Sequence, residues 1–108
     1  MQTIEKRYTT YLGVDCRRRH YHHRIGKWII EFSVQLEIWF KNQWQPIIRY
    51  DTAHGFAHKD LIYISGKAKK TTLDNIRNFN EALTFAENDI KSNWELYREQ
   101  FLKEANND

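Results

Sequence analysis

Residues 27–40 carry the pattern that most restricts the fold of this chain. Every second residue is apolar: Ile30, Phe32, Val34, Leu36, Ile38 and Phe40. The residues between them include Glu31, Ser33, Gln35 and Glu37. Six matches to a period of two predict a long antiparallel strand with one buried face and one solvated face. A helix is excluded, because a turn of about 100° per residue would scatter the six side chains around its axis.

Residues 44–50 predict a second strand, joined to the first by a polar turn at residues 41–43. Pro46 has no N–H to donate, so it favours an edge or a bulge in that strand. Residues 61–65 are rich in β-branched and aromatic side chains and predict a third strand. Together the three segments predict an antiparallel meander.

The segments on either side of this meander have a weaker pattern. Gly66 ends the third strand, and residues 67–72 are expected to form an exposed connection. Residues 8–14 and 18–25 are further strand candidates, and the second of these would join the long strand through a short turn. The sheet is therefore expected to contain three to five strands.

The last third of the chain changes from a period of two to a helical period. Its apolar residues are spaced by three or four: Ile76, Phe79, Leu83, Ala86, Ile90, Trp94, Tyr97 and Phe101. This stripe predicts one long helix that ends near Lys103 and packs its apolar side on the sheet. Asn78 and Glu81 resemble a capping box at its start. The expected fold is α+β, an antiparallel β-sheet meander of three to five strands packed on one long C-terminal α-helix.

Length and composition predict a single domain over residues 1–108. Its parts are a basic N-terminal segment at 1–26, the β-meander at 27–66 and the C-terminal helix at 78–104. Apolar residues make up 41% of the chain, yet no run reaches the roughly 18 residues that span a bilayer, so no membrane contact is expected. A single cysteine, Cys16, cannot form an internal disulfide, which fits a cytoplasmic location.

Charge is distributed unevenly along the chain. Residues 1–70 contain thirteen Lys or Arg and six Asp or Glu, whereas residues 71–108 contain four and eight. The densest basic stretch includes Arg17, Arg18, Arg19, Tyr21, His22 and Arg24. Cations interleaved with rings can pair with phosphates and stack on bases, so these six residues are the expected nucleic-acid contact. A solvated basic strand would explain the same composition.

Residues 49–61, with the sequence RYDTAHGFAHKDL, are the candidate catalytic segment. Its site residues are expected to be Arg49, Asp51, His54, His58 and Asp60. The segment joins two hairpin strands, and Gly55 permits a sharp reversal at positive φ. The side chains are therefore expected to converge on a rigid support, where catalytic groups tend to lie.

Three chemical interpretations of this segment stay open. In metal-independent RNA cleavage, a His or Asp takes the proton of a 2′-OH, a second His protonates the leaving 5′-oxygen, and Arg49 stabilises the phosphate charge. In a metal site, His54, His58 and Asp60 are the ligands, with Asp51 as a fourth. In a structural turn, Asp51 accepts backbone hydrogen bonds and the histidines pack or face solvent. The first interpretation is the one carried forward, and it needs no cofactor.

A sequence pattern in this region resembles a known family. The motif W-x-P-I/V-x-R-Y-D-T-A-H-G-F-A-H-x-D, from Trp44 to Asp60, and the EALTFAExDI-type helix at 81–90 resemble a family of small uncharacterised prokaryotic proteins over residues 27–103. More distantly, the RYD…G…H core resembles TumE-type toxins of toxin–antitoxin pairs, although the histidines here are spaced H-x3-H rather than H-x-H. The second resemblance implies a toxin that acts on RNA or translation and is neutralised by a helix-turn-helix antitoxin.

The sequence thus predicts a toxin-like, RNA-directed protein, expected to be a metal-independent ribonuclease. The alternative is a non-enzymatic module that binds nucleic acid or protein through its basic segment and open sheet face. We expect one sheet face to stay uncovered, with Glu31, Ser33, Gln35, Glu37 and Arg49. That face is available to RNA, to an antitoxin protein or to a second copy of the chain.

Overall fold

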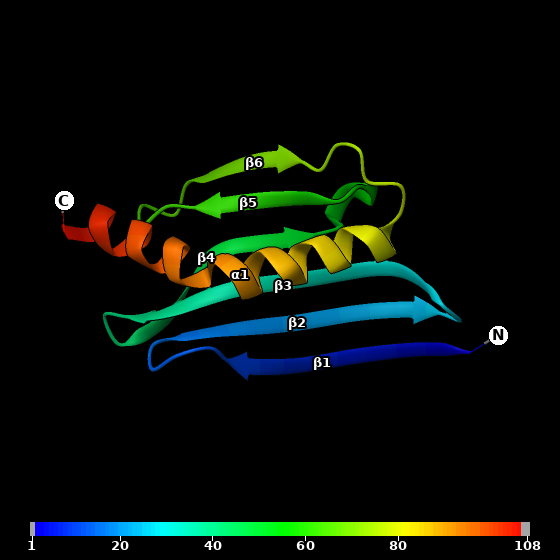
Figure 1. Ribbon diagram of the computed structural model, residues 1–108, viewed down its shortest axis with the longest axis horizontal. Helices are drawn as coiled ribbons and strands as arrows, with labels where there is room; N and C mark the ends of the chain where they lie inside the picture. The colour runs from blue at the N-terminus through cyan, green and yellow to red at the C-terminus, as the bar shows by residue number, and fades with distance from the viewer. Residues whose placement is uncertain (1, 107–108) are drawn as a thin grey trace.

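An antiparallel sheet with one long helix across it makes up the structure, a computed structural model that describes residues 2–106 (Figure 1). Within those residues the strands are β1 (Thr3–Tyr11), β2 (Cys16–Ile25), β3 (Trp28–Phe40), β4 (Gln43–Asp51), β5 (His58–Ile62) and β6 (Ala68–Thr72). They lie in sequence order in a single six-stranded sheet. A short 3-10 turn, η1 (Ala53–Gly55), joins β4 to β5, and the helix is α1 (Phe79–Asn106). The α+β class is confirmed, with six strands where three to five were expected.

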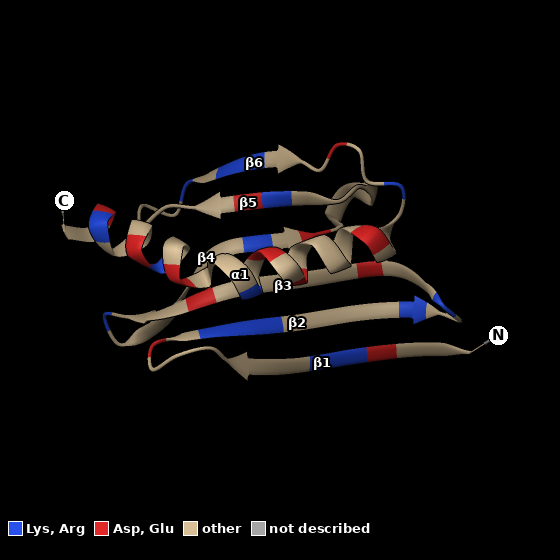
Figure 2. Ribbon diagram, viewed as in Figure 1, with Lys and Arg blue, Asp and Glu red and all other residues tan. Residues whose placement is uncertain are grey.

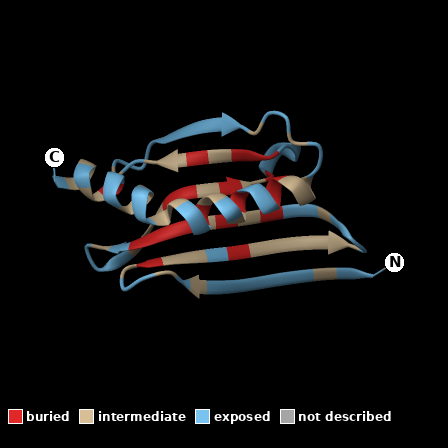
Figure 3. Cartoon of the chain, viewed as in Figure 1, coloured by how far each residue is buried: buried red, intermediate tan, exposed pale blue. Residues whose placement is uncertain are grey.

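The strand that sequence reasoning missed is β6. Residues 67–72 were expected to be an exposed connection, which is wrong: β6 pairs antiparallel with β5. Gly66 adopts a φ of +88°, and the Tyr63 N–H donates to the Lys67 carbonyl at 2.8 Å, which closes a hairpin. Every residue of β6 is exposed, as Figure 3 shows. An edge strand without a buried face leaves no apolar alternation in the sequence.

The core lies between β3, β4 and α1. Four of the six alternating residues of β3 are buried: Phe32, Val34, Leu36 and Ile38. Ile30 is 41% exposed, so the expectation of a buried side chain there is wrong. The register between β3 and β4 shifts after Leu36, next to Pro46, and both Ile47 and Ile48 are buried as a result. The expected bulge near Pro46 is therefore present, at a residue that cannot donate to the ladder.

α1 begins where its cap was expected. The Asn78 Oδ1 accepts a hydrogen bond from the Glu81 N–H at 2.9 Å. The buried residues of the helix are Ala82, Leu83, Ala86, Ile90 and Phe101. Near its other end, Arg98 donates to both oxygens of Asp15 at 2.8 Å, which fixes the helix to the β1–β2 turn. A side chain at Gly13 in that turn would come within 2.9 Å of Trp94.

Two residues of neighbouring strands bind the helix at a common point. Tyr50 of β4 donates to Asp89 of α1 at 2.6 Å. Lys59 of β5 donates to Tyr97 at 2.8 Å, and the Tyr97 hydroxyl in turn donates to Asp89 at 2.7 Å. Asp89 therefore ties both strands to the helix through the covered face of the sheet.

The opposite sheet face is called the open face below. None of the elements formed by residues 2–106 lies over it (Figure 1). Within the same residues, no helix has both the length and the apolar character needed to cross a lipid bilayer.

Candidate functional site

The register of β4 with β5 brings the expected catalytic residues to one face. Arg49 pairs with Asp60, and Asp51 pairs with His58. Directly paired residues of an antiparallel ladder share a face, and successive residues alternate. Because Tyr50 lies on the covered face, these four side chains lie on the open face. Four of the five expected residues therefore share one face of the hairpin.

Three of these residues and a lysine form a compact group, called the His58 cluster: Asp51, His58, Asp60 and Lys70. The His58 Nε2 lies 2.8 Å from the Asp51 Oδ1 and 3.8 Å from the Asp60 Oδ2. The Lys70 Nζ lies 3.1 Å from the same Nε2 and 3.6 Å from the Asp60 Oδ1. The side chains of His58 and Asp60 are only 1% and 10% exposed. The cluster is thus a buried imidazole and carboxylate, with the more exposed side chains of Asp51 and Lys70 beside them.

The hydrogen bonds of His58 orient its ring. Its Nδ1 lies 3.4 Å from the Phe56 carbonyl oxygen, and its Nε2 faces Asp51. The Asp51 carboxylate and the Lys70 ammonium both face this Nε2, at 2.8 Å and 3.1 Å, and the three groups hold one another at the edge of the cluster. Asp51 also accepts from the Ala53 N–H at 3.1 Å, as expected for an Asp in a turn.

Arg49 and His54 stand outside this group. The Arg49 Nε donates to the Gln35 Oε1 at 2.7 Å, so its guanidinium leans toward β3 while remaining beside Asp60 in the ladder. His54 lies in η1 with a φ of +70° and is exposed. Among the described residues no hydrogen bond or ion pair joins His54 to the cluster. The loop therefore does not bring a second histidine over the site.

Lys70 is the site residue that sequence reasoning missed. It lies opposite Asp60 because β6 continues the sheet beyond β5. The available signal was the pair of runs on either side of Gly66, which is typical of a hairpin with a short loop. Continuing the register across that loop places a lysine next to the buried carboxylate.

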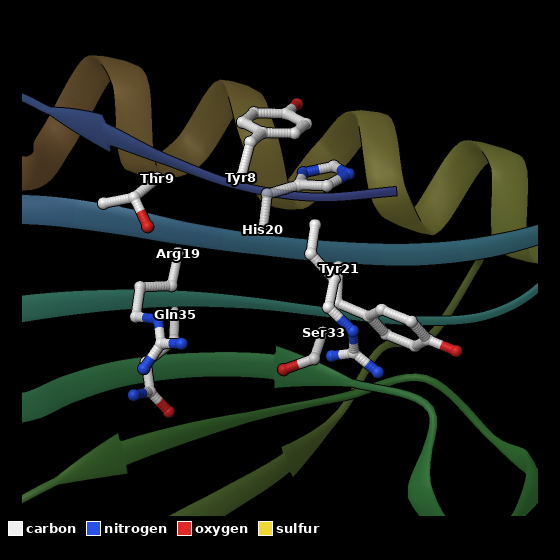
Figure 4. A pocket seen from close by; sticks show the side chains of 8 residues that line it. Tyr8, Thr9, Arg19, His20, Tyr21, Ser33 and Gln35 are labelled. Carbon is white, nitrogen blue, oxygen red and sulfur yellow. The ribbon is translucent and has the colours of Figure 1, made fainter. Parts of the chain in front are cut away.

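The expected nucleic-acid contact is divided between two faces. In β2, residues paired with the open-face positions of β3 are Arg17, Arg19 and Tyr21. The alternate residues lie on the covered face: Arg18, His22 and Arg24. The six side chains therefore do not form one surface, because successive residues of a strand point to opposite sides of the sheet. Figure 4 shows Arg19 and Tyr21 on one side of the strands and His20 on the other.

Arg19 and Tyr21 of that set border a shallow hollow over β1, β2 and β3. The hollow has a volume of about 350 Å³, and its open-face lining includes Arg7, Thr9, Arg19, Tyr21, Ser33 and Gln35 (Figure 4). The Arg7 guanidinium lies 4.0 Å from the centre of the Tyr21 ring. Arg19 is exposed, and no ion pair joins it to an acid in the described part of the chain. An unpaired arginine beside an aromatic ring is a suitable contact for a nucleotide.

On the covered face, the histidines of β2 are held neutral. His20 is buried, stacks on Tyr8 with ring centres 4.4 Å apart, and has its Nε2 2.6 Å from the His22 Nδ1. Burial, followed by repulsion from His22 and Arg18, lowers the pKa of His20 to about 4. Burial also lowers the pKa of His22. Neither ring is therefore a cation at neutral pH, and His22 lies on the side away from the hollow.

Cys16 is not available as a nucleophile. The residue is fully buried at the start of β2, and burial together with the charge of Asp15 raises its thiol pKa to about 12. The thiolate required for attack does not form near neutral pH.

The open face also carries a second group of metal-ligand type, called the His23 cluster: Glu5, His23 and Glu31. The candidate ligand atoms lie within 4.8 Å of one another, as do those of Asp51, His58 and Asp60. The Tyr21 hydroxyl donates to Glu31 at 2.6 Å and lies 3.0 Å from Glu5, which occupies both carboxylates. Both sets have residues able to hold a metal ion, in different surroundings.

A family model described as a domain of unknown function, DUF7718, matches residues 1–107. The chain belongs to this family. The DUF7718 match covers β1 to α1 together, so the open face and both clusters lie within the family's domain. Searches of curated proteins and of solved structures find no match, and the likeness to TumE-type toxins stays a prediction.

Proposed function

We propose that this protein is RNA-directed, binding single-stranded RNA on its open face and cleaving it at the His58 cluster. The observation that carries the proposal is the pairing of Asp51 with a buried imidazole, next to an ammonium group, on a sheet face with unpaired arginine. Asp51, His58 and Lys70 can move a proton and neutralise a phosphate within a few ångströms of one another.

Charge distribution supports RNA as the ligand. Figure 2 shows lysine and arginine on β1, β2, β4 and β6 and several acidic residues along α1. On the open face, phosphates would be drawn to Arg7 and Arg19 at the hollow, away from the acidic residues of the helix. The same face offers rings for unstacked bases: Tyr21 beside Arg7, and Trp44 with the Arg17 guanidinium 4.1 Å from its centre. Stacking of splayed bases on such rings is typical of proteins that bind single-stranded RNA.

The chemistry proposed is metal-independent transfer of the phosphodiester to the neighbouring 2′-oxygen. The Asp51 carboxylate, held by His58, takes the 2′-OH proton while that oxygen attacks phosphorus. The bond from phosphorus to the 5′-oxygen breaks, and the Lys70 ammonium donates a proton to the leaving oxygen. The products are a 2′,3′-cyclic phosphate and a 5′-hydroxyl. Arg49 neutralises charge on the phosphate, and Lys70 replaces the second histidine expected from the sequence.

The decisive variant is His58→Ala, with His23→Ala as the matched control on the same face. Loss of the group that holds Asp51 should lower the cleavage rate by roughly 10²-fold or more, while affinity for RNA stays within about twofold. His23→Ala should cleave like the wild type. Purified proteins would be assayed on a labelled single-stranded RNA in EDTA, and growth would be followed after conditional expression. Equal cleavage by the wild type and His58→Ala would contradict the proposal.

A second candidate function is a binding module without chemistry, favoured by the hollow around Arg19. Arg19→Gln should weaken RNA binding at every sequence tested and reduce the slope of log affinity against log salt by about 1. A wild type that binds RNA with this salt dependence but never cleaves it would select this second function. Filter binding at several salt concentrations provides the measurement.

The partner and the location complete the proposal. Since RNA would occupy the open face, an antitoxin protein or a second copy that covered this face would block the His58 cluster and neutralise the activity. The resemblance to TumE-type toxins supports the antitoxin as the partner. We place the protein in the cytoplasm, in keeping with a single, buried cysteine.

A further inference from the structure

We infer that Asp51, His58 and Asp60 form a binding site for one divalent transition-metal ion, such as Mn²⁺ or Zn²⁺, in which the ion takes the place of the Lys70 ammonium. The binding itself follows from the geometry of the cluster. Its consequence for RNA cleavage rests on the function proposed above.

The distances between the ligand atoms fit one ion. Two ligands about 2.1 Å from a metal are roughly 3.0–3.4 Å apart in octahedral or tetrahedral geometry. The His58 Nε2 lies 2.8 Å from the Asp51 Oδ1 and 3.8 Å from the Asp60 Oδ2. All three residues offer an atom within 4.8 Å of the others. The two separations from His58 differ from the range of a metal site by no more than about 0.4 Å.

The surroundings of Asp60 point independently to a bound cation. Its side chain is 10% exposed, and its Oδ1 is buried without a hydrogen-bond partner. A buried carboxylate oxygen without a hydrogen bond is costly and calls for a cation or a donor. The Lys70 Nζ, 3.6 Å away, supplies charge but no hydrogen bond to this atom. An ion at the centre of the cluster would be bound directly by Asp60.

The Lys70 ammonium is placed so that it can move out of the His58 cluster. Its side chain is 49% exposed and extends from β6, the edge strand, so the ammonium can move into solvent without disturbing the core. The imidazole among the ligands decides the class of ion. Mg²⁺ and Ca²⁺ prefer oxygen-only sites, whereas Mn²⁺ and Zn²⁺ bind imidazole together with carboxylates.

The His23 cluster has the same residue types but does not meet the same conditions. The Tyr21 hydroxyl donates to Glu31 and lies within hydrogen-bond distance of Glu5, so the cluster's two carboxylates already have a polar neighbour. The Glu31 side chain is 52% exposed and that of His23 is 21% exposed, so water already solvates the group. A carboxylate-to-amide change at Glu31 is therefore a control with matched chemistry on the same face.

Metal binding would oppose the proposed cleavage. The ion would occupy the Asp51 oxygen that accepts the 2′-OH proton, and it would displace the ammonium that protonates the leaving oxygen. Mn²⁺ should therefore inhibit cleavage at concentrations where it fills the site, and EDTA should restore the rate.

The test is calorimetric titration of EDTA-treated, desalted protein with MnCl₂. We expect one Mn²⁺ per chain in the wild type and a loss of affinity of about tenfold or more in Asp60→Asn and Asp51→Asn. Lys70→Met should bind Mn²⁺ more tightly, by roughly three- to tenfold, because the ion no longer displaces an ammonium. Glu31→Gln should match the wild type. Circular dichroism without metal verifies that each variant is folded.

The outcomes separate the metal site from the proposed function. Three results would overturn the metal site. They are no Mn²⁺ binding by the wild type, an affinity of both Asp variants equal to that of the wild type, and weaker binding by Lys70→Met than by the wild type. If the variants bind Mn²⁺ as expected but the protein does not cleave RNA, the metal site is supported and the ribonuclease function is rejected. Binding without inhibition of cleavage would support the site and reject the acid–base route.

Discussion

The open face carries two clusters of the same make-up, a histidine between two carboxylates, that differ in their surroundings. In the His58 cluster, the side chains of His58 and Asp60 are 1% and 10% exposed, and a lysine supplies the nearest charge. In the His23 cluster, the side chains of His23 and Glu31 are 21% and 52% exposed, and the hydroxyl of Tyr21 binds both acids. Residue types alone would rank the two clusters equally.

Strand position explains the difference. The first cluster lies on β4 and β5, inside the sheet, where both neighbouring strands exclude water from the carboxylate and the imidazole. The second lies toward the outer edge, on β1, β2 and the exposed start of β3. Charged groups that lose their water must find partners within the protein, whereas solvated ones need none. Position in the sheet therefore separates a candidate site from a solvated group.

The largest expected effect on stability comes from breaking the buried pair. Asp51→Ala leaves the His58 ring without its closest partner, so the free energy of unfolding should fall by about 2–3 kcal/mol. The matched change at the exposed cluster, Glu31→Ala, should cost no more than about 0.5 kcal/mol. Urea denaturation of both variants gives the comparison. Equal losses for the two would show that burial does not distinguish the clusters.

A third histidine, His20, is buried on the covered face and should make the stability of the protein depend on pH. The folded protein lowers the pKa of His20 to about 4, so between pH 6.5 and 4 the unfolded chain binds a proton there that the folded chain does not. Stability should therefore fall by about 2 kcal/mol from pH 7 to 5, despite Glu87 at 3.6 Å from the His20 Nδ1. Replacing His20 with Gln should remove most of this loss. An unchanged acid dependence in that variant would contradict the assignment to His20.

The smallest effect is expected at the hydroxyl that bridges the two exposed acids. Tyr21→Phe removes the donor shared by Glu5 and Glu31, whose carboxylates then rely on water alone. Because both acids are exposed, the cost should be at most about 0.5 kcal/mol and should shrink in high salt. Thermal melts at two ionic strengths would measure it. A loss above about 2 kcal/mol would mean that the His23 cluster is a structural element rather than a solvated one.

The fold was most predictable where burial imposes a period. The alternation from Phe32 to Ile38 and the helical stripe of α1 both follow from one face meeting the core. The bounds of β1 and the presence of β6 could not be predicted in this way, because an exposed edge strand requires no alternating apolar side chains. Sequence reasoning identified residues 8–14 as a strand candidate, whereas β1 covers Thr3–Tyr11.

The site was predictable to the extent that strand register places it. Asp51, His58 and Asp60 converge because a hairpin pairs them, whereas His54 belongs to a turn whose direction depends on the backbone of η1. Lys70 required the unrecognised strand β6. The division of Arg18 from Arg19 was available from the strand period alone, since adjacent residues of a strand cannot share a face.

The hydrogen bonds that link Tyr50 and Lys59 to Asp89, the second through Tyr97, couple the helix on the covered face to the groups on the open face. These two strand residues are the chain neighbours of Asp51 and of both His58 and Asp60, so the helix is bonded to the backbone that spaces the groups of the proposed cleavage site. A genetic screen for inactive protein should therefore recover changes at Asp89 and Tyr97, residues that no substrate would ever touch. In the proposed ribonuclease, a molecule bound to the outer side of α1 would therefore change the cleavage rate through the thickness of a single sheet.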